Sequence, residues 1–214
     1  MAVAVDNDGN IYSTGYFYNS SVTFGAFTLN NTSSAGVANI FLVKYDPNGN
    51  VIWAQTVYGL SDDLATSITC DPSGNVYITG MSNSNILTFG TTTFTNSGLF
   101  DVFLAKYDPN GNVLWAKNAA GTNNDVAAQV ITDTSGNVYV TGYFQSRHMH
   151  FGSIILANAD TSGNTDDIFL AKYDSFGNVL WAKSAGGKLE DRGVGITVDH
   201  LGQIFVTGYF YSDT

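Results

Sequence analysis

Pairs of adjacent acidic or amide residues recur at equivalent positions of a repeated sequence pattern. Their side-chain oxygens make them the first candidates for ligand binding. They are Asp62-Asp63, Asn124-Asp125 and Glu190-Asp191. If the segments that follow them meet at a common axis, a ring of carboxylates could hold a cation or a basic ligand. The simpler interpretation, which the pattern favours, is that each aspartate accepts hydrogen bonds from backbone N–H groups in a local link.

Two further patterns contain side chains that can ligate metals. The run Asp6-Asn-Asp8-Gly-Asn10 resembles the start of a calcium loop, but an apolar strand follows at once, where such a loop needs a later bidentate carboxylate. His148 and His150 would share one face of a strand, yet two histidines without a third ligand make a poor zinc site. We therefore predict a structural turn and a polar loop, with no metal and no cofactor.

Lysine occupies one position in three copies of an apolar phrase, at Lys44, Lys106 and Lys172. The stem of such a lysine can lie along an apolar surface while its amine reaches a carboxylate or a carbonyl oxygen, so we predict a structural role. The chain contains no Gly-x-Ser-x-Gly elbow, phosphate-binding loop or zinc-protease motif. The sequence thus predicts no catalytic site.

The elements that carry these residues are two β-hairpins that alternate along the chain. The first hairpin, which we call AB after its two strands, occurs four times, with its turn glycine at 9, 74, 136 and 202. The second hairpin, with strands C and D, is called CD. The CD hairpin ends on tryptophan and occurs at 41–53, 103–115 and 169–181. A repeated period near 64 residues, built on strands, indicates stacked copies of one supersecondary unit. We predict a single array over residues 1–214, with units near 1–61, 62–123 and 124–189 and a partial unit at 190–214.

Each hairpin turns on the pattern Asp-x-x-Gly-Asn, with Gln203 in the last copy. The aspartate can accept hydrogen bonds from the backbone two residues on, and glycine supplies the left-handed residue. The strands Val76–Thr79, Val138–Thr141 and Ile168–Ala171 are apolar without alternation. Such strands are covered on both faces, as in a sheet held between two neighbouring sheets.

A longer connection joins each AB hairpin to its CD hairpin, at residues 18–39, 83–100 and 145–166. Every copy contains Phe-Gly followed by a short apolar pair, which predicts one or two extra edge strands. These connections differ most in length and composition, so we expect any copy-specific ligand contact to lie there.

The composition excludes several classes of protein. Of the 214 residues, 44% are hydrophobic, which excludes a disordered chain. The net charge of −10 disfavours nucleic acid and anionic membranes as partners, since phosphate groups need a surplus of lysine and arginine. No apolar stretch is long enough to span a bilayer. Repeat sequence follows Met1 at once, so we expect no signal peptide in these residues and read the chain as a piece of a longer one.

Cys70 is the only cysteine, so no internal disulfide is possible. It takes the position of Val5, Thr132 and Val198 in the other copies, which predicts a small buried strand residue.

The phrases Asp71–Gly80 and Asp133–Gly142, together with the three Lys-Tyr-Asp hairpins, resemble the SBBP family of bacterial β-propeller repeats. The resemblance covers essentially the whole chain and implies an all-β propeller on a secreted or cell-surface protein, with no activity attached to the repeat. The runs Gly111–Trp115 and Gly177–Trp181 also resemble the tryptophan-docking repeat of quinone-dependent dehydrogenase propellers. In both families the tryptophan packs between blades, so the likeness does not imply a quinone.

The resemblance and the repeat count together predict about three and a half blades of four antiparallel strands. Propellers close with four to eight blades, and both ends of this chain are AB hairpins. We therefore expect an open arc with apolar end faces, completed by self-association or by further blades. Strand grouping within a blade, AB with the following CD or CD with the following AB, is open at this stage.

For function, these features favour a non-catalytic binding or scaffold module of an exported bacterial protein that presents loops to a protein or glycan ligand. The alternative is part of an enzymatic propeller, of the lyase or quinone-dependent oxidoreductase type, whose site lies in other blades.

Overall fold

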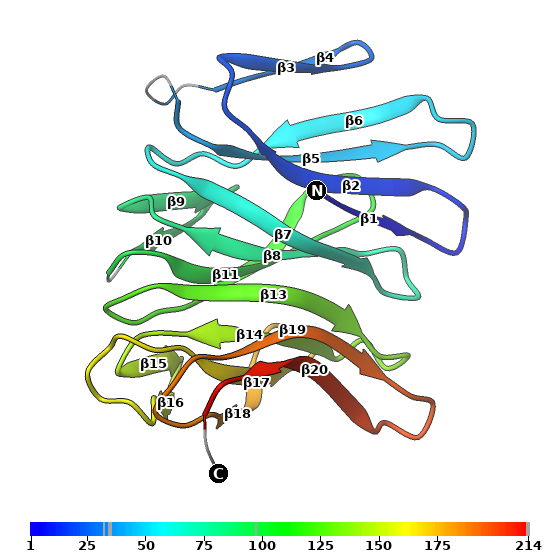
Figure 1. The fold of residues 1–214 in the computed structure, drawn as a ribbon. Helices are drawn as coiled ribbons and strands as arrows, with labels where there is room; N and C mark the ends of the chain where they lie inside the picture. Colours follow the sequence, from blue (N-terminus) through cyan, green and yellow to red (C-terminus); the bar gives the residue numbers. More distant parts are fainter. Residues whose placement is uncertain (32, 34–35, 97, 213–214) are drawn as a thin grey trace.

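The structure is a computed structural model that describes residues 1–31, 33, 36–96 and 98–212. Throughout these residues the regular elements are β-strands, and no helix long and apolar enough to cross a membrane occurs among them. The chain is a stack of antiparallel sheets that follow one another in sequence order (Figure 1). This arrangement confirms the all-β propeller class predicted from the sequence, with sheets that do not close into a ring.

Three sheets have four strands each and form complete blades. Blade 1 contains β1 (Ala2–Val5), β2 (Ile11–Phe17), β5 (Asn39–Tyr45) and β6 (Val51–Thr56). Blade 2 contains β7 (Asp63–Cys70), β8 (Val76–Ser82), β11 (Asp101–Tyr107) and β12 (Val113–Ala119). Blade 3 contains β13 (Asp125–Thr132), β14 (Val138–Phe144), β17 (Asp167–Tyr173) and β18 (Val179–Ala185). A two-stranded half-blade, β19 (Asp191–Val198) and β20 (Ile204–Phe210), follows.

Each blade unites an AB hairpin with the CD hairpin that follows it, which decides the grouping left open by the sequence. The second strand of each AB hairpin pairs with the first strand of the CD hairpin in one constant register. Glycine of the Thr-Gly pair lies opposite phenylalanine, as Gly15 with Phe41, Gly80 with Phe103 and Gly142 with Phe169. The first strands β1, β7, β13 and β19 contact one another in succession, so they form the inner side of the arc.

The connections inside the blades form three separate hairpins, which we call insertion hairpins. They are β3–β4 (Ser21–Phe24, Phe27–Asn30), β9–β10 (Ile86–Phe89, Thr92–Thr95) and β15–β16 (His148–Phe151, Ile154–Ala157). The prediction of extra strands is confirmed, with two in each connection, but their placement at the edges of the blades is wrong, because they join no blade sheet. The physical reason is aromatic packing: the phenylalanine of each Phe-Gly pair folds onto the phenylalanine of the third blade strand. The ring centres are 5.0, 5.3 and 5.4 Å apart in the pairs Phe24–Phe41, Phe89–Phe103 and Phe151–Phe169.

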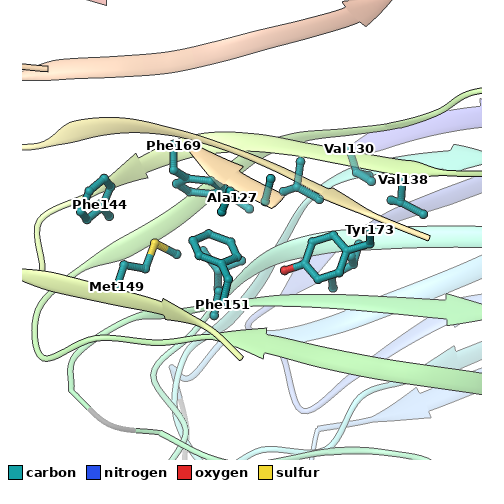
Figure 2. Packing of buried hydrophobic residues seen from close by; sticks show 14 of the residues in the cluster. Ala127, Val130, Val138, Phe144, Met149, Phe151, Phe169 and Tyr173 are labelled. Atoms are coloured by element: carbon teal, nitrogen blue, oxygen red, sulfur yellow. The ribbon is translucent and has the colours of Figure 1, made fainter. Parts of the chain in front are cut away.

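The hydrophobic core lies between the blades. One cluster combines Val102 and Leu104 of blade 2 with Phe144 and Phe169 of blade 3, and Figure 2 shows part of it, with Met149 and Phe151 of the insertion hairpin. The strands Val76–Thr79 and Val138–Thr141 are buried throughout, as their apolar sequence predicts. In Ile168–Ala171 only Phe169 and Ala171 are buried, because Ile168 and Leu170 face the half-blade.

Candidate functional site

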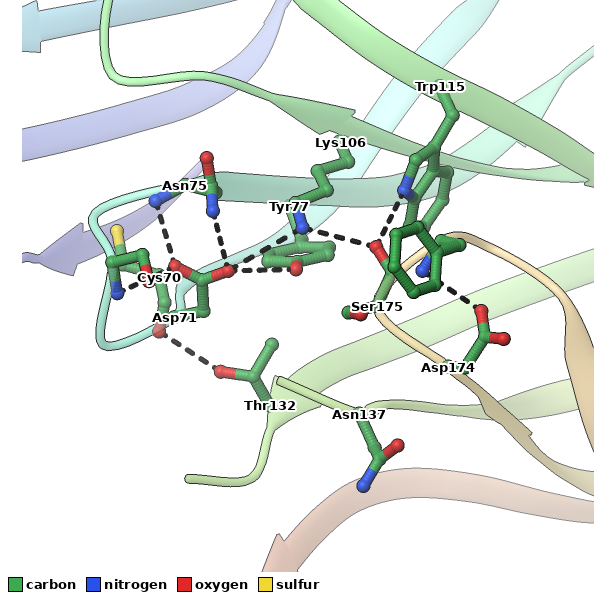
Figure 3. Close-up of polar contacts among 12 residues, drawn as sticks. Cys70, Asp71, Asn75, Tyr77, Lys106, Trp115, Thr132, Asn137, Asp174 and Ser175 are labelled. Carbon is green, nitrogen blue, oxygen red and sulfur yellow. Dashed lines mark hydrogen bonds and ion pairs between the residues drawn. The ribbon is translucent and has the colours of Figure 1, made fainter. Parts of the chain in front are cut away.

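A lysine and a tryptophan of one blade converge on a single backbone carbonyl of the next blade. Trp115 Nε1 and Lys106 Nζ both donate to the carbonyl oxygen of Ser175 in the next CD turn, at 3.1 and 3.2 Å. Lys106 Nζ also lies 5.0 Å from the centre of the Tyr77 ring and 3.7 Å from Asp71 Oδ2. We call Tyr77, Lys106 and Trp115 a turn socket, and Figure 3 shows it with the turn that it holds.

The same socket recurs in blade 1. Trp53 Nε1 and Lys44 Nζ donate to the carbonyl oxygen of Pro109 at 3.2 and 3.0 Å, with Lys44 Nζ 5.1 Å from the ring centre of Tyr12. These contacts confirm the structural role predicted for the lysines. Blade 3 has the socket as well, since Lys172 Nζ lies 4.9 Å above the Tyr139 ring. No turn of the described residues fills it.

A glycine of the CD turn faces each occupied socket. Gly49, Gly111 and Gly177 all have a positive φ, between 80° and 89°, which L side chains rarely adopt. A Cβ on Gly177 would also lie 2.9 Å from the Trp115 ring, whereas a Cβ on Gly49 would meet no atom within 4 Å. The socket therefore selects glycine for a second reason, which is the space taken by the indole.

This difference predicts unequal costs for two substitutions at equivalent positions. Gly49→Ala is expected to lower the unfolding free energy by about 1–2 kcal/mol, the cost of the left-handed backbone. Gly177→Ala carries that cost and a steric cost of about 1–3 kcal/mol from the indole of Trp115. Urea denaturation of both variants measures the difference, and equal losses would show that the contact with Trp115 does not constrain the turn.

The turn aspartates are fully engaged within the hairpins. Asp71 Oδ1 accepts the N–H groups of Ser73 and Asn75 at 3.0 and 2.9 Å, and Oδ2 accepts from the Asn75 amide and the Tyr77 hydroxyl at 2.9 and 3.0 Å. Asp6 is bound in the same way. Burial tends to raise the pKa of Asp6, but the hydrogen bonds outweigh it and hold the pKa below its usual value. These contacts confirm the structural turn that the sequence predicts at Asp6–Asn10.

The second residue of each acid pair is buried at the start of an inner strand. Asp63 accepts hydrogen bonds from the hydroxyls of Ser82 and Ser84. Asp125 accepts from the Ser146 hydroxyl at 2.8 Å and from its N–H at 3.1 Å. Burial raises the pKa of Asp63 to about 6 and that of Asp125 to about 7, although the serine hydrogen bonds act in the opposite direction. The hydrogen bonds confirm the local structural interpretation, with serine hydroxyls as partners that the sequence analysis missed.

The sequence contains a regular spacing that could have identified these serines as partners of the aspartates. Ser84, Ser146 and Ser212 each stand four residues after the glycine of a Thr-Gly pair, and Ser212 donates to Asp191. The first members of the acid pairs do not join a common ring of carboxylates. Asp62 accepts from the Ala38 N–H, the Asn124 amide donates to Gln145, and Glu190 lies 3.9 Å from Arg192.

The remaining candidates lie apart from these contacts. His148 and His150 are exposed on one face of β15, while Met149 between them is buried on the other, as the strand geometry predicts. His200 is exposed in the last AB turn. Across the described residues no group of three or more His, Cys, Asp or Glu side chains is arranged to hold a metal ion.

Cys70 is half-buried, so the prediction of a buried residue is wrong. It is the last residue of β7 and borders a small hollow beside Asp71 and Thr132, where strand packing ends. Burial of the thiol still raises its pKa to about 12, which makes Cys70 unreactive at neutral pH.

The described residues form a groove of about 660 Å³ between blades 1 and 2. Its walls are the insertion hairpins β3–β4 and β9–β10, and its floor is the outermost strand of blade 1, β6, with the turn of blade 2. Within the lining, Gln55 donates to the carbonyl oxygen of Gly111 at 3.0 Å and so links the two blades. The groove thus combines variable hairpins with the backbone of an edge strand.

The repeated blades and turn sockets define a β-propeller repeat protein. Residues 53–88, from the tryptophan of blade 1 into the insertion hairpin of blade 2, match the family model for the SBBP β-propeller repeat. The resemblance seen in the sequence is confirmed by this match.

Two relatives align with most of the chain. An uncharacterised WD repeat-containing protein of Acanthamoeba polyphaga mimivirus is 28% identical over 199 residues, which cover 80% of this chain and 14% of the relative. The regulatory protein FlaEY of Caulobacter vibrioides is 27% identical over 168 residues, which cover 77% of this chain and 17% of the relative. The chain therefore spans between about a seventh and a sixth of the length of these proteins, which are named as a repeat-containing and a regulatory protein.

Proposed function

We propose that the protein is a non-catalytic propeller module that binds an extended segment of another protein. The observation that carries the proposal is the groove of about 660 Å³ with β6 along its floor. An extended peptide can add to the edge of a sheet, where backbone hydrogen bonds supply affinity and neighbouring side chains supply specificity. The groove meets both needs, because β6 is the last strand of its sheet and the insertion hairpins differ between copies.

The polar residues of the blades support a binding role over a catalytic one. The lysines and tryptophans of blades 1 and 2 and the aspartates of the turns are engaged in hydrogen bonds that hold turns and blades together. The alternative function, part of an enzymatic propeller of the lyase or quinone-dependent oxidoreductase type, has no comparable observation in its favour. The names of the two relatives also agree with a module that acts by binding.

A displayed library of random linear peptides, selected on the immobilised chain, tests the proposal. We expect enriched peptides whose affinity falls at least tenfold on Thr91→Arg, because Thr91 lines the groove and an arginine there would fill it. The matched control is Thr93→Arg, an exposed position of the same insertion hairpin outside the groove, which should leave affinity unchanged. Equal effects of both variants, binding confined to a glycan array, or reproducible turnover of a substrate would contradict the proposal.

We further propose that the module belongs to an exported bacterial protein that is secreted or displayed at the cell surface. Its support is the resemblance to SBBP repeats alone. Fractionation of the encoding organism with an antibody against the chain tests this location, and recovery solely in the cytosolic fraction would contradict it.

A further inference from the structure

The groove between blades 1 and 2 is lined by a buried tyrosine whose hydroxyl lacks a hydrogen-bond partner. Tyr107, the last residue of β11, lines the groove and is 2% exposed. Its side chain lies on the same side of β11 as Phe103 and Ala105 and belongs to the same apolar cluster. Within the described part of the chain its hydroxyl neither donates nor accepts a hydrogen bond. A buried polar group of this kind costs free energy until a partner is supplied.

The tyrosines of the AB hairpins show how a buried hydroxyl is satisfied in this fold. Tyr77 and Tyr139 donate to Asp71 and Asp133 at 3.0 Å. Tyr107 has no such acceptor among the residues that the structure describes. Burial raises the pKa of Tyr107, so at neutral pH its hydroxyl keeps the proton and remains a donor. An acceptor can reach this hydroxyl from the groove.

The side chains around the groove limit what such an acceptor can be. None of the described residues that line the groove carries a charge, although the net charge of the chain is −10. Gln55 and Thr88 lie in the lining, where the equivalent positions of the next repeat are Lys117 and His150. A charged group brought into the groove would lose hydration without meeting an opposite charge, which is costly. The side chains that an occupant turns inward are therefore uncharged.

A second group of the lining is an unused acceptor. Asn112 lines the groove and precedes Val113, which pairs with Tyr107 across the CD hairpin. The amide nitrogen of Asn112 donates to Asp108 at 2.7 Å, while its amide oxygen accepts no hydrogen bond within the described residues. The groove thus offers one donor and one acceptor. A carboxamide side chain complements both, since it contains an acceptor oxygen and a donor nitrogen.

We propose that Tyr107 determines the specificity of this groove and selects an uncharged extended segment with an inward-facing asparagine or glutamine. This inference rests on the proposed function, because the segment is the one that adds to β6. Every second side chain of a strand points to the same face, so the backbone can pair with β6 while one carboxamide enters the groove. The Tyr107 hydroxyl donates to the amide oxygen, and the amide nitrogen donates to Asn112 Oδ1.

The test repeats the selection of random linear peptides on the natural chain and on Tyr107→Phe. We expect the natural chain to enrich peptides with asparagine or glutamine at one fixed position, and the variant to enrich peptides without this preference. The matched control is Tyr173→Phe, which removes the equivalent hydroxyl of blade 3 outside the groove and should retain the preference. Both variants should keep the Tm of the natural chain, because neither hydroxyl is hydrogen-bonded within the described residues.

A double-mutant cycle on the tightest amide-containing peptide measures the contact itself. Tyr107→Phe should weaken its binding about 3- to 10-fold. Exchange of the peptide's asparagine for leucine, or glutamine for methionine, should weaken binding to the natural chain by a similar factor and leave binding to the variant unchanged. Exchange for aspartate or glutamate should weaken binding at least tenfold.

Several results would overturn the inference and leave the proposed function standing. They are peptides that Thr91→Arg weakens but Tyr107→Phe does not, enriched peptides with a carboxylate at the fixed position, and a Tm lowered by Tyr107→Phe, which would reveal a partner for the hydroxyl within the fold. Absence of any peptide that Thr91→Arg weakens would overturn the inference together with the proposed function.

Discussion

Phe144→Ala is expected to lower the unfolding free energy by about 3–5 kcal/mol, one of the largest losses that a single substitution can cause in this fold. Phe144 is 0% exposed in the cluster between blades 2 and 3, and truncation leaves a cavity that rigid strands cannot close. The equivalent residue of the half-blade, Phe210, is 73% exposed. Phe210→Ala should therefore change stability by less than about 0.5 kcal/mol.

This pair of variants isolates the effect of a neighbouring blade, because the residue type and the position in the repeat are the same. Urea denaturation followed by tryptophan fluorescence measures both. Similar losses for the two variants would mean that the half-blade is packed in solution as tightly as blade 3, contrary to the structure.

The free energy of unfolding is expected to fall, by on the order of 1–3 kcal/mol, as the pH rises from about 4 to about 7. In the folded chain burial raises the pKa of Asp63 to about 6 and that of Asp125 to about 7, against a usual value of 3.8. The unfolded chain releases these protons first, so deprotonation favours unfolding throughout this window. The lowered pKa values of turn aspartates such as Asp6 and Asp133 act in the opposite sense, but only below their usual value.

Asp125→Asn should reduce this pH dependence and leave the variant more stable than the natural chain at pH 8. The amide keeps an acceptor for Ser146 and cannot ionise. Asp8→Asn, an exposed turn position, serves as the control and should leave the slope unchanged. Thermal unfolding at pH 4, 5, 6, 7 and 8 gives the curves. A natural chain whose stability is flat or rising over this window would contradict the assignment of buried, proton-retaining carboxyls.

Much of the fold could be predicted from the sequence because each repeat contains the local turn and strand patterns of its own hairpins. The Asp-x-x-Gly-Asn turns, the apolar strands and the period predicted stacked four-stranded blades. The sequence could not predict which hairpins share a blade. AB and CD hairpins alternate along the chain, so an AB hairpin could join the CD hairpin that follows it or the one that precedes it. The pairing of Gly80 with Phe103 across an insertion hairpin is a long-range contact that no local pattern specifies.

The insertion hairpins show why the predicted placement of the extra strands at blade edges was wrong. The segment around Phe89 has the length and composition of a strand, but its direction is set by the Phe103 ring, which it contacts only in the folded blade. Only part of the turn socket could be predicted from the sequence. A lysine reaching a carbonyl was predicted, but the sharing of one carbonyl by Lys44 and Trp53 depends on how far each blade is offset from the next. Local sequence does not contain that offset.

The fold depends most on strands that need a blade on each face, and amide hydrogen exchange tests this requirement most directly. We predict that the amides of β8 and β14 exchange slowly, through global unfolding, while those of β20 exchange orders of magnitude faster through local opening. Equal protection of β14 and β20, or rapid exchange throughout β8 and β14, would contradict the radial packing of blades.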